Sequence, residues 1–479
     1  MKKIIKNLFI GTFAVMFFSC DMETDLEVAN IEQPSSQQIG IEATADLLFR
    51  SWYEAVNEYT GPGMALAVMS DNSTCSWGNA GMRDTSSEPR VAWDNNQTYS
   101  YAAFTEGYYN SMYSILADAN ALILPLGNNV YSDDDKVESL ARFGQAAALG
   151  SLALVFDRVY ASDETGTLNN GEPYNYDDAM EIALEKLDLA IAAADRGDFT
   201  LDTQINGTTL TSAQWSEFLN SYGARLLANS ARNSTQRAAL DWDKVLDYAN
   251  NGLTYDLEVT GQGFGVWTSL WNVYAIFGGW TRIDLYTINL MDNDYPDYWP
   301  TGATTLDEAE SDDLRLTSDF EYLSSQNFIA SRGEYHYSSY RYSRYDAYTD
   351  SNWSTSHPEY LSAENDLYKA EALYRTGDLA GAAAVINAGT RTTRGGLPEI
   401  SATESEIVDA LHYERFVELP HTGMGLPFFE MRGKDLLQSG TFLHFPIPGA
   451  AINAAGLEYY TFGGTTGVAG EDYSTGGWR

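Results

Sequence analysis

The chain has 479 residues, of which 44% are hydrophobic and 20% are charged, so it can bury a sizeable core and does not have the composition of a disordered protein. Its charge is one-sided, with 67 Asp and Glu residues against 28 Lys and Arg residues and a formal net charge of −39. Such a surface repels phosphate backbones, which excludes nucleic acid as a partner. Two cysteines cannot form a disulfide framework, and five histidines leave little for a histidine metal site.

The N-terminus has the features of a bacterial export signal. Residues 1–6 are basic, and residues 8–18 form an apolar stretch that suits secretion but is too short to span a bilayer. A small residue, Ser19, precedes Cys20, as in a lipobox whose cysteine is acylated, and the acidic residues that follow resemble the surface-export signal of some outer-membrane lipoproteins. We predict a signal peptide over 1–19, a lipid on Cys20 and a lipidated tether over 20–38. The alternative is an ordinary signal peptide with an incidental cysteine.

Apolar residues at helical spacing then predict four helix hairpins. The expected pairs are 43–59 with 100–124, 140–160 with 178–197, 213–232 with 241–252, and 361–376 with a helix that begins at Leu379. Asp178 and Glu181 have the spacing of a capping box, and Gly377 followed by Asp378 is typical of a helix stop and the next N-cap. Hairpins of this size resemble tetratricopeptide units, which stack into a superhelix.

Long segments between and after the hairpins hold most of the tryptophans and glycines, and loops of that length are usually functional. The alternating tyrosines of 335–345 predict one strand with an aromatic face. We therefore expect a mainly α fold in a single domain over 39–479. Its helix-hairpin scaffold is expected over about 40–255 and 360–419, and its loop-rich ligand lobe over about 60–98, 256–358 and 420–479.

The C-terminal part contains charged residues that suggest structure rather than catalysis. Glu414 and Glu418 lie four residues apart on one expected helix. Arg415 and Arg432 can neutralise them, so an ion-paired scaffold is favoured over acid–base catalysis. Residues 442–448, with two phenylalanines and two prolines, are expected to form an extended segment that packs on this helix.

Motifs for enzymes, nucleotides and metals are incomplete. The histidines lack the spacing of a zinc protease, and the glycine loop 261–265 lacks the sixth-position glycine of a dinucleotide-binding loop. Residues 292–294 begin like a calcium loop, but Pro296 and Asp297 replace a ligand and the essential glycine. We therefore expect no enzymatic activity, no catalytic residue, no cofactor and no metal ligand, with structural calcium at an acidic loop left open.

Aromatic residues beside short polar side chains are the remaining signal. A flat ring covers the C–H face of a sugar, while Asn, Asp and Arg bind its hydroxyls. One candidate set lies in the 71–95 loop: Trp77, Trp93, Asp71, Asn72, Asn79 and Arg83. A second set contains Trp280, Tyr298 and Trp299, with Trp267, Trp271 and Arg282 nearby. The two sets are expected to form opposite walls of one cleft; the alternative for each ring is a core residue that anchors its loop.

The chain resembles the SusD/RagB family of outer-membrane nutrient-binding lipoproteins along nearly its whole length. The resemblance is densest around Cys20, in Met69–Asn72 with Trp77–Met82 and Ser87–Arg90, and in a C-terminal block of Lys369–Asp378, Tyr413–Leu419, Phe428–Arg432 and Leu443–Pro448. It implies a SusD-like α fold on four tetratricopeptide-type hairpins with an irregular glycan-binding lobe. It also implies a partner, a SusC-like TonB-dependent barrel, over which the lipoprotein sits as a lid.

We therefore interpret the sequence as a cell-surface lipoprotein of the outer membrane, held there by its lipid alone. It is expected to capture oligosaccharides or polysaccharides and to deliver them to a SusC-like transporter. One alternative is a surface-anchored glycoside hydrolase, although no spacing singles out two carboxylates among 67 acids. The other is a peptide-capturing member of the same family.

Overall fold

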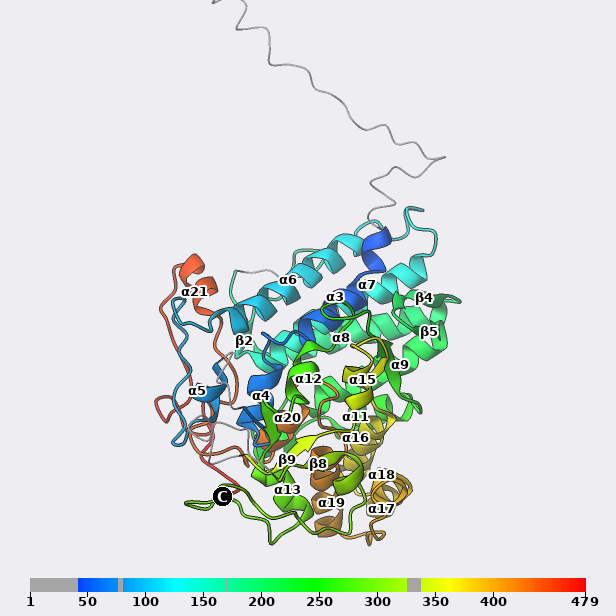
Figure 1. Ribbon diagram of the computed structural model, residues 1–479. Coiled ribbons are helices and arrows are strands. Elements are labelled where there is room, and N and C mark those ends of the chain that lie inside the picture. Colours follow the sequence, from blue (N-terminus) through cyan, green and yellow to red (C-terminus); the bar gives the residue numbers. More distant parts are fainter. Residues whose placement is uncertain (1–41, 76–80, 169–170, 325–336) are drawn as a thin grey trace, which may run out of the picture. The chain divides into compact units, whose positions relative to one another are not determined.

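Helices dominate the described residues of the computed structural model, which are 42–75, 81–168, 171–324 and 337–479 (Figure 1). The mainly α fold expected from the sequence is confirmed. All described residues belong to one unit, which runs from Glu42 to Arg479. The predicted signal peptide, Cys20 and the tether lie outside the described residues. A membrane-spanning helix is not found within the described ranges.

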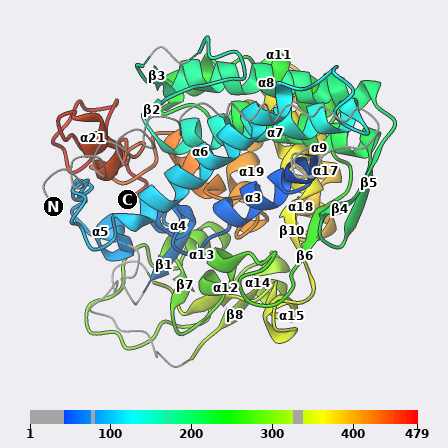
Figure 2. The same cartoon turned by 90° about the horizontal axis from the view of Figure 1, so that it is seen from above.

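The four predicted hairpins are present as packed helix pairs. Their members are α3 (Leu48–Val56) with α6 (Ala103–Ile123), α7 (Asp134–Val155) with α8 (Tyr176–Arg196), α9 (Ser212–Ala228) with α11 (Trp242–Asn250), and α16 (Ser362–Arg375) with α17 (Leu379–Ala388). Neighbouring pairs also contact one another, through α6 with α7 and α8 with α9 (Figure 2), and through α11 with α16 (Figure 1). The hairpins therefore stack side by side, as the tetratricopeptide interpretation predicts.

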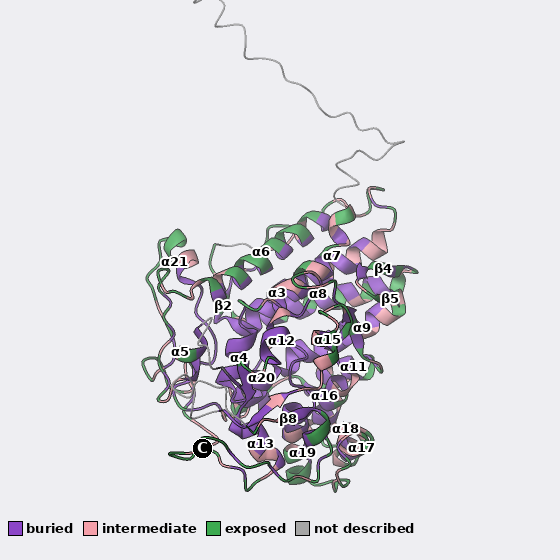
Figure 3. Ribbon diagram, viewed as in Figure 1, coloured by how far each residue is buried: buried purple, intermediate pink, exposed green. Residues whose placement is uncertain are grey.

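Small residues let these helices approach closely, as expected for the 140–160 segment. A Cβ at Gly150 of α7 would lie 2.7 Å from Leu226 of α9, and one at Gly223 would lie 2.9 Å from Tyr248 of α11. The middle helix α7 is buried along most of its length, whereas α6 presents an exposed outer face (Figure 3). A helix that packs on several sides carries small and apolar residues all round, which explains the alanines and glycines of α7.

The predicted helix caps are right at one boundary and wrong at another. Gly377 adopts φ +98°, and the Asp378 side chain accepts a hydrogen bond from the amide of Gly381, so this stop and N-cap are confirmed. The capping box expected at Asp178 does not form, because α8 begins two residues earlier at Tyr176. Asp178 instead lies in the first turn, where a carboxylate is favourable near the positive end of the helix dipole.

The remaining elements are short and belong mostly to the loop-rich segments. The strands of the described ranges form five antiparallel pairs: β1 (Ser73–Cys75) with β7 (Thr281–Ile283), β2 (Arg158–Val159) with β3 (Tyr174–Asn175), β4 (Thr200–Ile205) with β5 (Thr208–Thr211), β6 (Leu257–Thr260) with β10 (Ser356–Tyr360), and β8 (Phe320–Tyr322) with β9 (Tyr340–Tyr342). The other helices are α4 (Gly63–Met69), α5 (Met82–Ser86), α10 (Ser234–Ala238), α12 (Leu270–Ala275), α13 (Leu285–Met291), α14 (Arg315–Ser318), α15 (Asp346–Asp350), α18 (Thr390–Thr393), α19 (Glu404–Val417), α20 (Leu426–Arg432) and α21 (Gly449–Ala455).

The predicted tyrosine strand is shorter than expected. Only β9 is a strand in the described part of 335–345, and residues 335–336 lie outside the described residues. Tyr340 and Tyr342 are buried in a cluster with Phe320, while Arg341 between them points to the other face. The alternation of side chains across a strand therefore gives the one aromatic face that the sequence predicts.

Buried ion pairs hold the C-terminal helices, as expected, but with other partners. Glu414 binds Arg315 of α14 through two hydrogen bonds of 2.7 and 2.8 Å, and Glu418 lies 3.1 Å from the same guanidinium. Arg415 instead binds Glu371 and Glu430, each at 2.7 Å. Adjacent residues of a helix point in different directions, so Glu414 and Arg415 of α19 cannot face one another.

Arg432 also has a different role from the one predicted, because it binds the backbone. Its guanidinium donates to the carbonyl oxygens of Leu154, Leu443 and Asn229 at 2.8–3.0 Å. The 442–448 segment is extended, with Phe445 hydrogen-bonded to Val155 and Asp157 at the end of α7. Its backbone also accepts a hydrogen bond from Asn95 at Ile447 and donates one from Leu443 to Asp472, so the segment is held by several elements besides the end of α7.

Candidate functional site

An aromatic cleft in the loop-rich lobe is the strongest candidate site. This cavity of about 520 Å³ is lined by Tyr59, Phe264, Leu270, Val273, Tyr274, Phe277, Trp280 and Trp353. Phe264 is 62% exposed, Phe277 44% and Trp280 37%. Large apolar side chains that are exposed together in one cavity are typical of a binding site rather than of ordinary surface.

The rings of the aromatic cleft hold one another in place. Phe277 and Trp280 stack with ring centroids 4.9 Å apart and planes 29° apart, and Tyr274 lies 5.1 Å from Trp280. Phe264 meets Trp353 edge-on at 5.3 Å. Rings that are already packed lose little freedom when a ligand binds, so the cleft is preorganised.

A glycine loop positions Phe264 at the rim of the cleft. A Cβ at Gly261 would overlap the carbonyl oxygen of Trp353, and the same oxygen accepts a hydrogen bond of 3.2 Å from the amide of Gly263. Gly263 and Gly265, on either side of Phe264, adopt φ +88° and +85°, which glycine tolerates best. The glycines of the 261–265 loop therefore have a structural role. They allow the backbone beside Phe264 to pack against the turn that carries Trp353.

Hydrogen bonds connect the floor of the cleft to the helical scaffold. Asn57, at the end of α3, accepts hydrogen bonds from the Trp271 amide at 3.0 Å and the Ser269 hydroxyl at 2.5 Å, both at the start of α12. Its side-chain amide donates to Glu359 at 3.1 Å, and Glu359 in turn binds Arg225 of α9 at 3.2 Å. Burial raises the pKa of Glu359 to about 7, although the Arg225 charge opposes the rise.

A second cavity, of about 400 Å³, adjoins the aromatic cleft and differs from it in chemistry. We call it the polar pocket; its lining is Ile276, Phe277, Gly278, Gly279, Arg282, Leu323, Arg341, Asp346, Thr349 and Asp350. Arg341 binds Asp346 through two hydrogen bonds of 2.7 Å and also binds Glu321. Phe277 lines both cavities, so a fixed polar wall lies next to an aromatic one.

Three residues predicted for the ligand site are buried and belong to the scaffold. Trp93 is only 3% exposed and meets Phe445 edge-on at 5.0 Å. Asp71 accepts hydrogen bonds of 3.1 Å from both Arg90 and Gln438, and Asn72 is equally buried. The core alternative therefore replaces the ligand-site interpretation for the Trp93 ring, and burial likewise removes Asp71 and Asn72 from the described surface that a ligand could reach.

The other predicted residues are dispersed. Trp280 lines the aromatic cleft, and Arg83 is exposed on α5. The Tyr298 hydroxyl donates to Glu88, and the Trp299 ring stacks on Tyr337 at 4.3 Å. Trp77 and Asn79 lie outside the described residues.

The expected cleft between the 71–95 loop and the 267–299 segment stays a prediction, because residues 76–80 lie outside the described residues. In the aromatic cleft, Trp280 of the second segment is joined by Tyr59, Phe264 and Trp353. Trp267 and Trp271 are core residues, with Trp267 stacked on Phe49 at 6.3 Å. Phe264 and Phe277 are not among the predicted site residues. The glycines next to them, in 261–265 and 277–280, are the sequence signal that could have pointed to them.

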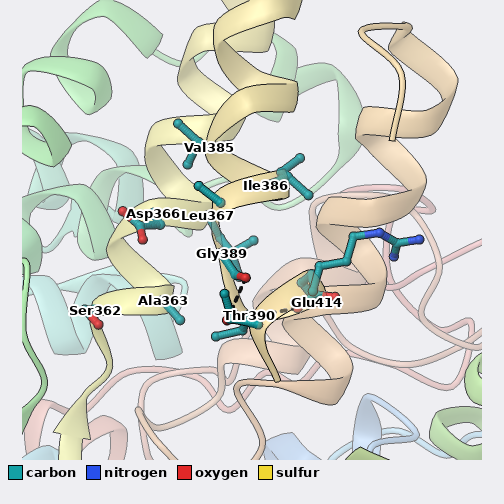
Figure 4. A pocket seen from close by; sticks show the side chains of 12 residues that line it. Ser362, Ala363, Asp366, Leu367, Val385, Ile386, Gly389, Thr390 and Glu414 are labelled. Atoms are coloured by element: carbon teal, nitrogen blue, oxygen red, sulfur yellow. Dashed lines mark hydrogen bonds between the residues drawn. The ribbon is translucent and has the colours of Figure 1, made fainter. Parts of the chain in front are cut away.

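Other cavities have less suitable walls. The one in Figure 4 measures about 200 Å³ and lies between α16, α17 and α19, with Leu367, Val385 and Ile386 beside Asp366. Thr390 donates to Glu414 at its edge at 3.0 Å, so this cavity adjoins the buried ion pairs. Within the described ranges no group of three or more His, Cys, Asp and Glu residues could hold a metal ion.

Buried histidines support the same floor and yield a pH prediction. The His357 ring lies 2.7 Å from Asn272 of α12, and burial lowers the pKa of His357 to about 4 and of His421 to about 3. Both values lie below the unfolded value of about 6.5. The folded state therefore takes up fewer protons, and this contribution to stability is lost as the pH falls from about 6.5.

We expect NMR of labelled imidazoles to find His357 and His421 neutral at pH 5. The variants His357→Gln and His421→Gln would identify the two signals. Titration of either ring near pH 6.5 in the folded protein would contradict this result, because an exposed imidazole titrates there.

Comparison with solved structures finds proteins of similar fold along most of the chain. A SusD superfamily protein from Parabacteroides distasonis ATCC 8503 matches with a TM-score of 0.56 and 13% identity, over 88% of this chain and 97% of that one. A SusD-like carbohydrate binding protein from Bacteroides vulgatus ATCC 8482 matches with a TM-score of 0.52 and 13% identity, over 83% of each chain. A crystal structure with xylogluco-oligosaccharide matches with a TM-score of 0.53 and 14% identity, over 92% of this chain and 93% of that one. No family sequence model and no curated protein matches the chain.

These matches confirm the resemblance to SusD proteins at the level of the fold. They cover most of this chain and most of each neighbour, although few residues are identical. The chain has a SusD-like fold.

Proposed function

We propose that this protein binds glycan in the aromatic cleft at the cell surface and delivers it to a SusC-like TonB-dependent barrel. The observation that carries the proposal is the cluster of exposed, mutually packed rings beside a polar pocket. Two neighbours of the same fold support it, one described as carbohydrate binding and one solved with a xylogluco-oligosaccharide. The lipid on Cys20 and the barrel partner rest on the sequence alone.

The chemistry of the cleft favours binding over hydrolysis. A glycoside hydrolase places two carboxyl groups across the scissile bond. The described lining of the aromatic cleft includes no Asp or Glu. The adjoining pocket has Asp350 and Asp346, and Asp346 is bound by Arg341. Rings without a carboxylate pair can hold a sugar but cannot protonate its glycosidic oxygen.

A glycan array compared with a peptide library tests the proposed ligand. We expect the chain from residue 21 onward to bind one or more oligosaccharides and no peptide, because stacked rings match the C–H faces of sugars. Product release from a polysaccharide panel would favour the hydrolase instead. Binding to peptides alone would favour the peptide-capturing alternative.

The anchor and the partner are tested in native outer membranes. We expect gentle affinity purification to recover a SusC-like protein in near-equal amount, since a lid buries a large surface on its barrel. The variant Cys20→Ala should leave the fold intact and release the protein from the membrane, because a lipid chain is its only proposed anchor. Unchanged membrane partition of this variant, or recovery of the lipoprotein alone, would contradict the respective part of the proposal.

A further inference from the structure

We infer that the ligand is a branched, uncharged oligosaccharide whose main chain lies in the aromatic cleft and whose branch enters the polar pocket. The inference rests on the proposed function and specifies the class of glycan. It comes from two cavities of different chemistry whose linings share one residue, Phe277.

The position of Phe277 gives the first argument. Its ring stacks on Trp280 in the aromatic cleft, and Phe277 also belongs to the lining of the polar pocket. A main chain that lies over Phe277 and Trp280 therefore runs beside a residue that also borders the polar pocket. A sugar attached to that main chain can enter the pocket without leaving the rings, whereas a linear chain leaves the pocket unused.

The walls of the polar pocket give the second argument. The aromatic cleft is lined by apolar and aromatic residues, whereas the lining of the polar pocket combines apolar residues with two arginines, two aspartates and a threonine. Arg341 is fixed by its two hydrogen bonds to Asp346, and Asp350 is exposed at the end of α15. Fixed donors and acceptors suit the hydroxyls of a sugar, which both donate and accept.

The charge balance gives the third argument and favours a neutral branch. The lining holds two arginines and two aspartates, and Arg341 is bound by Asp346 and by Glu321. The whole chain carries a formal net charge of −39. A carboxylate or sulfate on the branch would meet this negative field, while a neutral sugar would not.

Glycine keeps the polar pocket open. A Cβ at Gly278 would lie 2.8 Å from Cδ of Arg341 and 3.3 Å from Nη1 of Arg282. Any larger residue there would displace the arginine that forms the pocket wall. The Phe277-Gly278-Gly279-Trp280 sequence thus places two glycines, which leave room for a ligand group, between the two stacked rings.

The test compares linear and singly branched forms of the same main chain. The probes are β-1,4-glucan, β-1,4-mannan, β-1,4-xylan and α-1,4-glucan oligosaccharides of equal length, each with and without neutral single-sugar branches, measured by calorimetry. We expect the branched form of one main chain to bind roughly tenfold more tightly, which corresponds to about 1.4 kcal/mol and suits one or two added hydrogen bonds.

Variants then assign this preference to the polar pocket. Asp350→Ala and Arg341→Met should remove the preference for the branch and leave the affinity for the linear form unchanged. Trp280→Ala should weaken both forms, and Asp118→Ala, at an exposed aspartate of α6, should change neither.

Equal binding of linear and branched forms would overturn the inference while the proposed function stands. Equal loss of both forms in Asp350→Ala and Arg341→Met would also overturn it, because the pocket would then hold the main chain. If no oligosaccharide of the set or of the glycan array binds, the proposed function itself fails.

Discussion

Replacement of Trp280 by alanine is expected to weaken glycan binding about tenfold to a hundredfold, a loss of roughly 1–3 kcal/mol. The Trp280 ring is partly exposed in the aromatic cleft and is held by Phe277 and Tyr274, so its loss removes a fixed stacking surface. Calorimetry with the tightest ligand from the glycan array measures the change. Phe277→Ala should give a similar loss, because it removes the other member of the stacked pair.

The matched control is Leu314→Ala, at an apolar side chain that is 61% exposed outside the cleft. This variant should bind as the unmodified protein does. Normal binding by folded Trp280→Ala and Phe277→Ala proteins would place the ligand elsewhere. Trp77→Ala belongs in the same series, because Trp77 stays a predicted ligand residue that lies outside the described residues.

Replacement of Arg315 by alanine is expected to cost about 3–5 kcal/mol of folding stability. The Arg315 side chain is fully buried and binds Asp313, Glu414 and Glu418. Its removal leaves three buried acids without the guanidinium that they share. Thermal and urea unfolding of the variant should therefore show a clearly lower midpoint than the unmodified protein.

Arg196→Ala is the control for this experiment. Arg196 also binds two acids, Asp135 at 2.8 Å and Glu138 at 2.7 Å, but its side chain is 53% exposed. An ion pair in water contributes at most about 1 kcal/mol, so this variant should unfold nearly normally. Equal shifts for the two variants would contradict the assignment of a structural role to the buried network.

The helices could be predicted because their signals are local. Apolar residues at three- and four-residue spacing reflect the face that each helix buries, and Gly377 with Asp378 reflects backbone geometry at one turn. The capping box at Asp178 is the exception. An acidic residue is favourable both at an N-cap and in the first turn of a helix. The sequence does not distinguish these two positions for Asp178, and the start of α8 at Tyr176 places it in the first turn.

Ion-pair partners required the tertiary structure. Glu414 and Glu418 suggest a scaffold by themselves, but their partner Arg315 lies 99 residues before Glu414. No spacing rule connects residues so far apart, and the local arginine at 415 faces another pair of acids across the core. Burial of a charge depends on all the elements around it, which a single segment does not contain.

The ligand site, too, could be predicted only in part from the sequence. Composition and local pattern predict a helical, acidic chain rich in rings, with Trp280 in an aromatic segment beside polar residues. Burial in the folded chain identifies Trp93 as a core residue, and the fold brings Tyr59, Phe264 and Trp353 together with Trp280 in one cleft. No local pattern separates these cases, because a ring has the same chemistry in a core and in a cleft and its exposure is set by contacts between segments far apart in the chain.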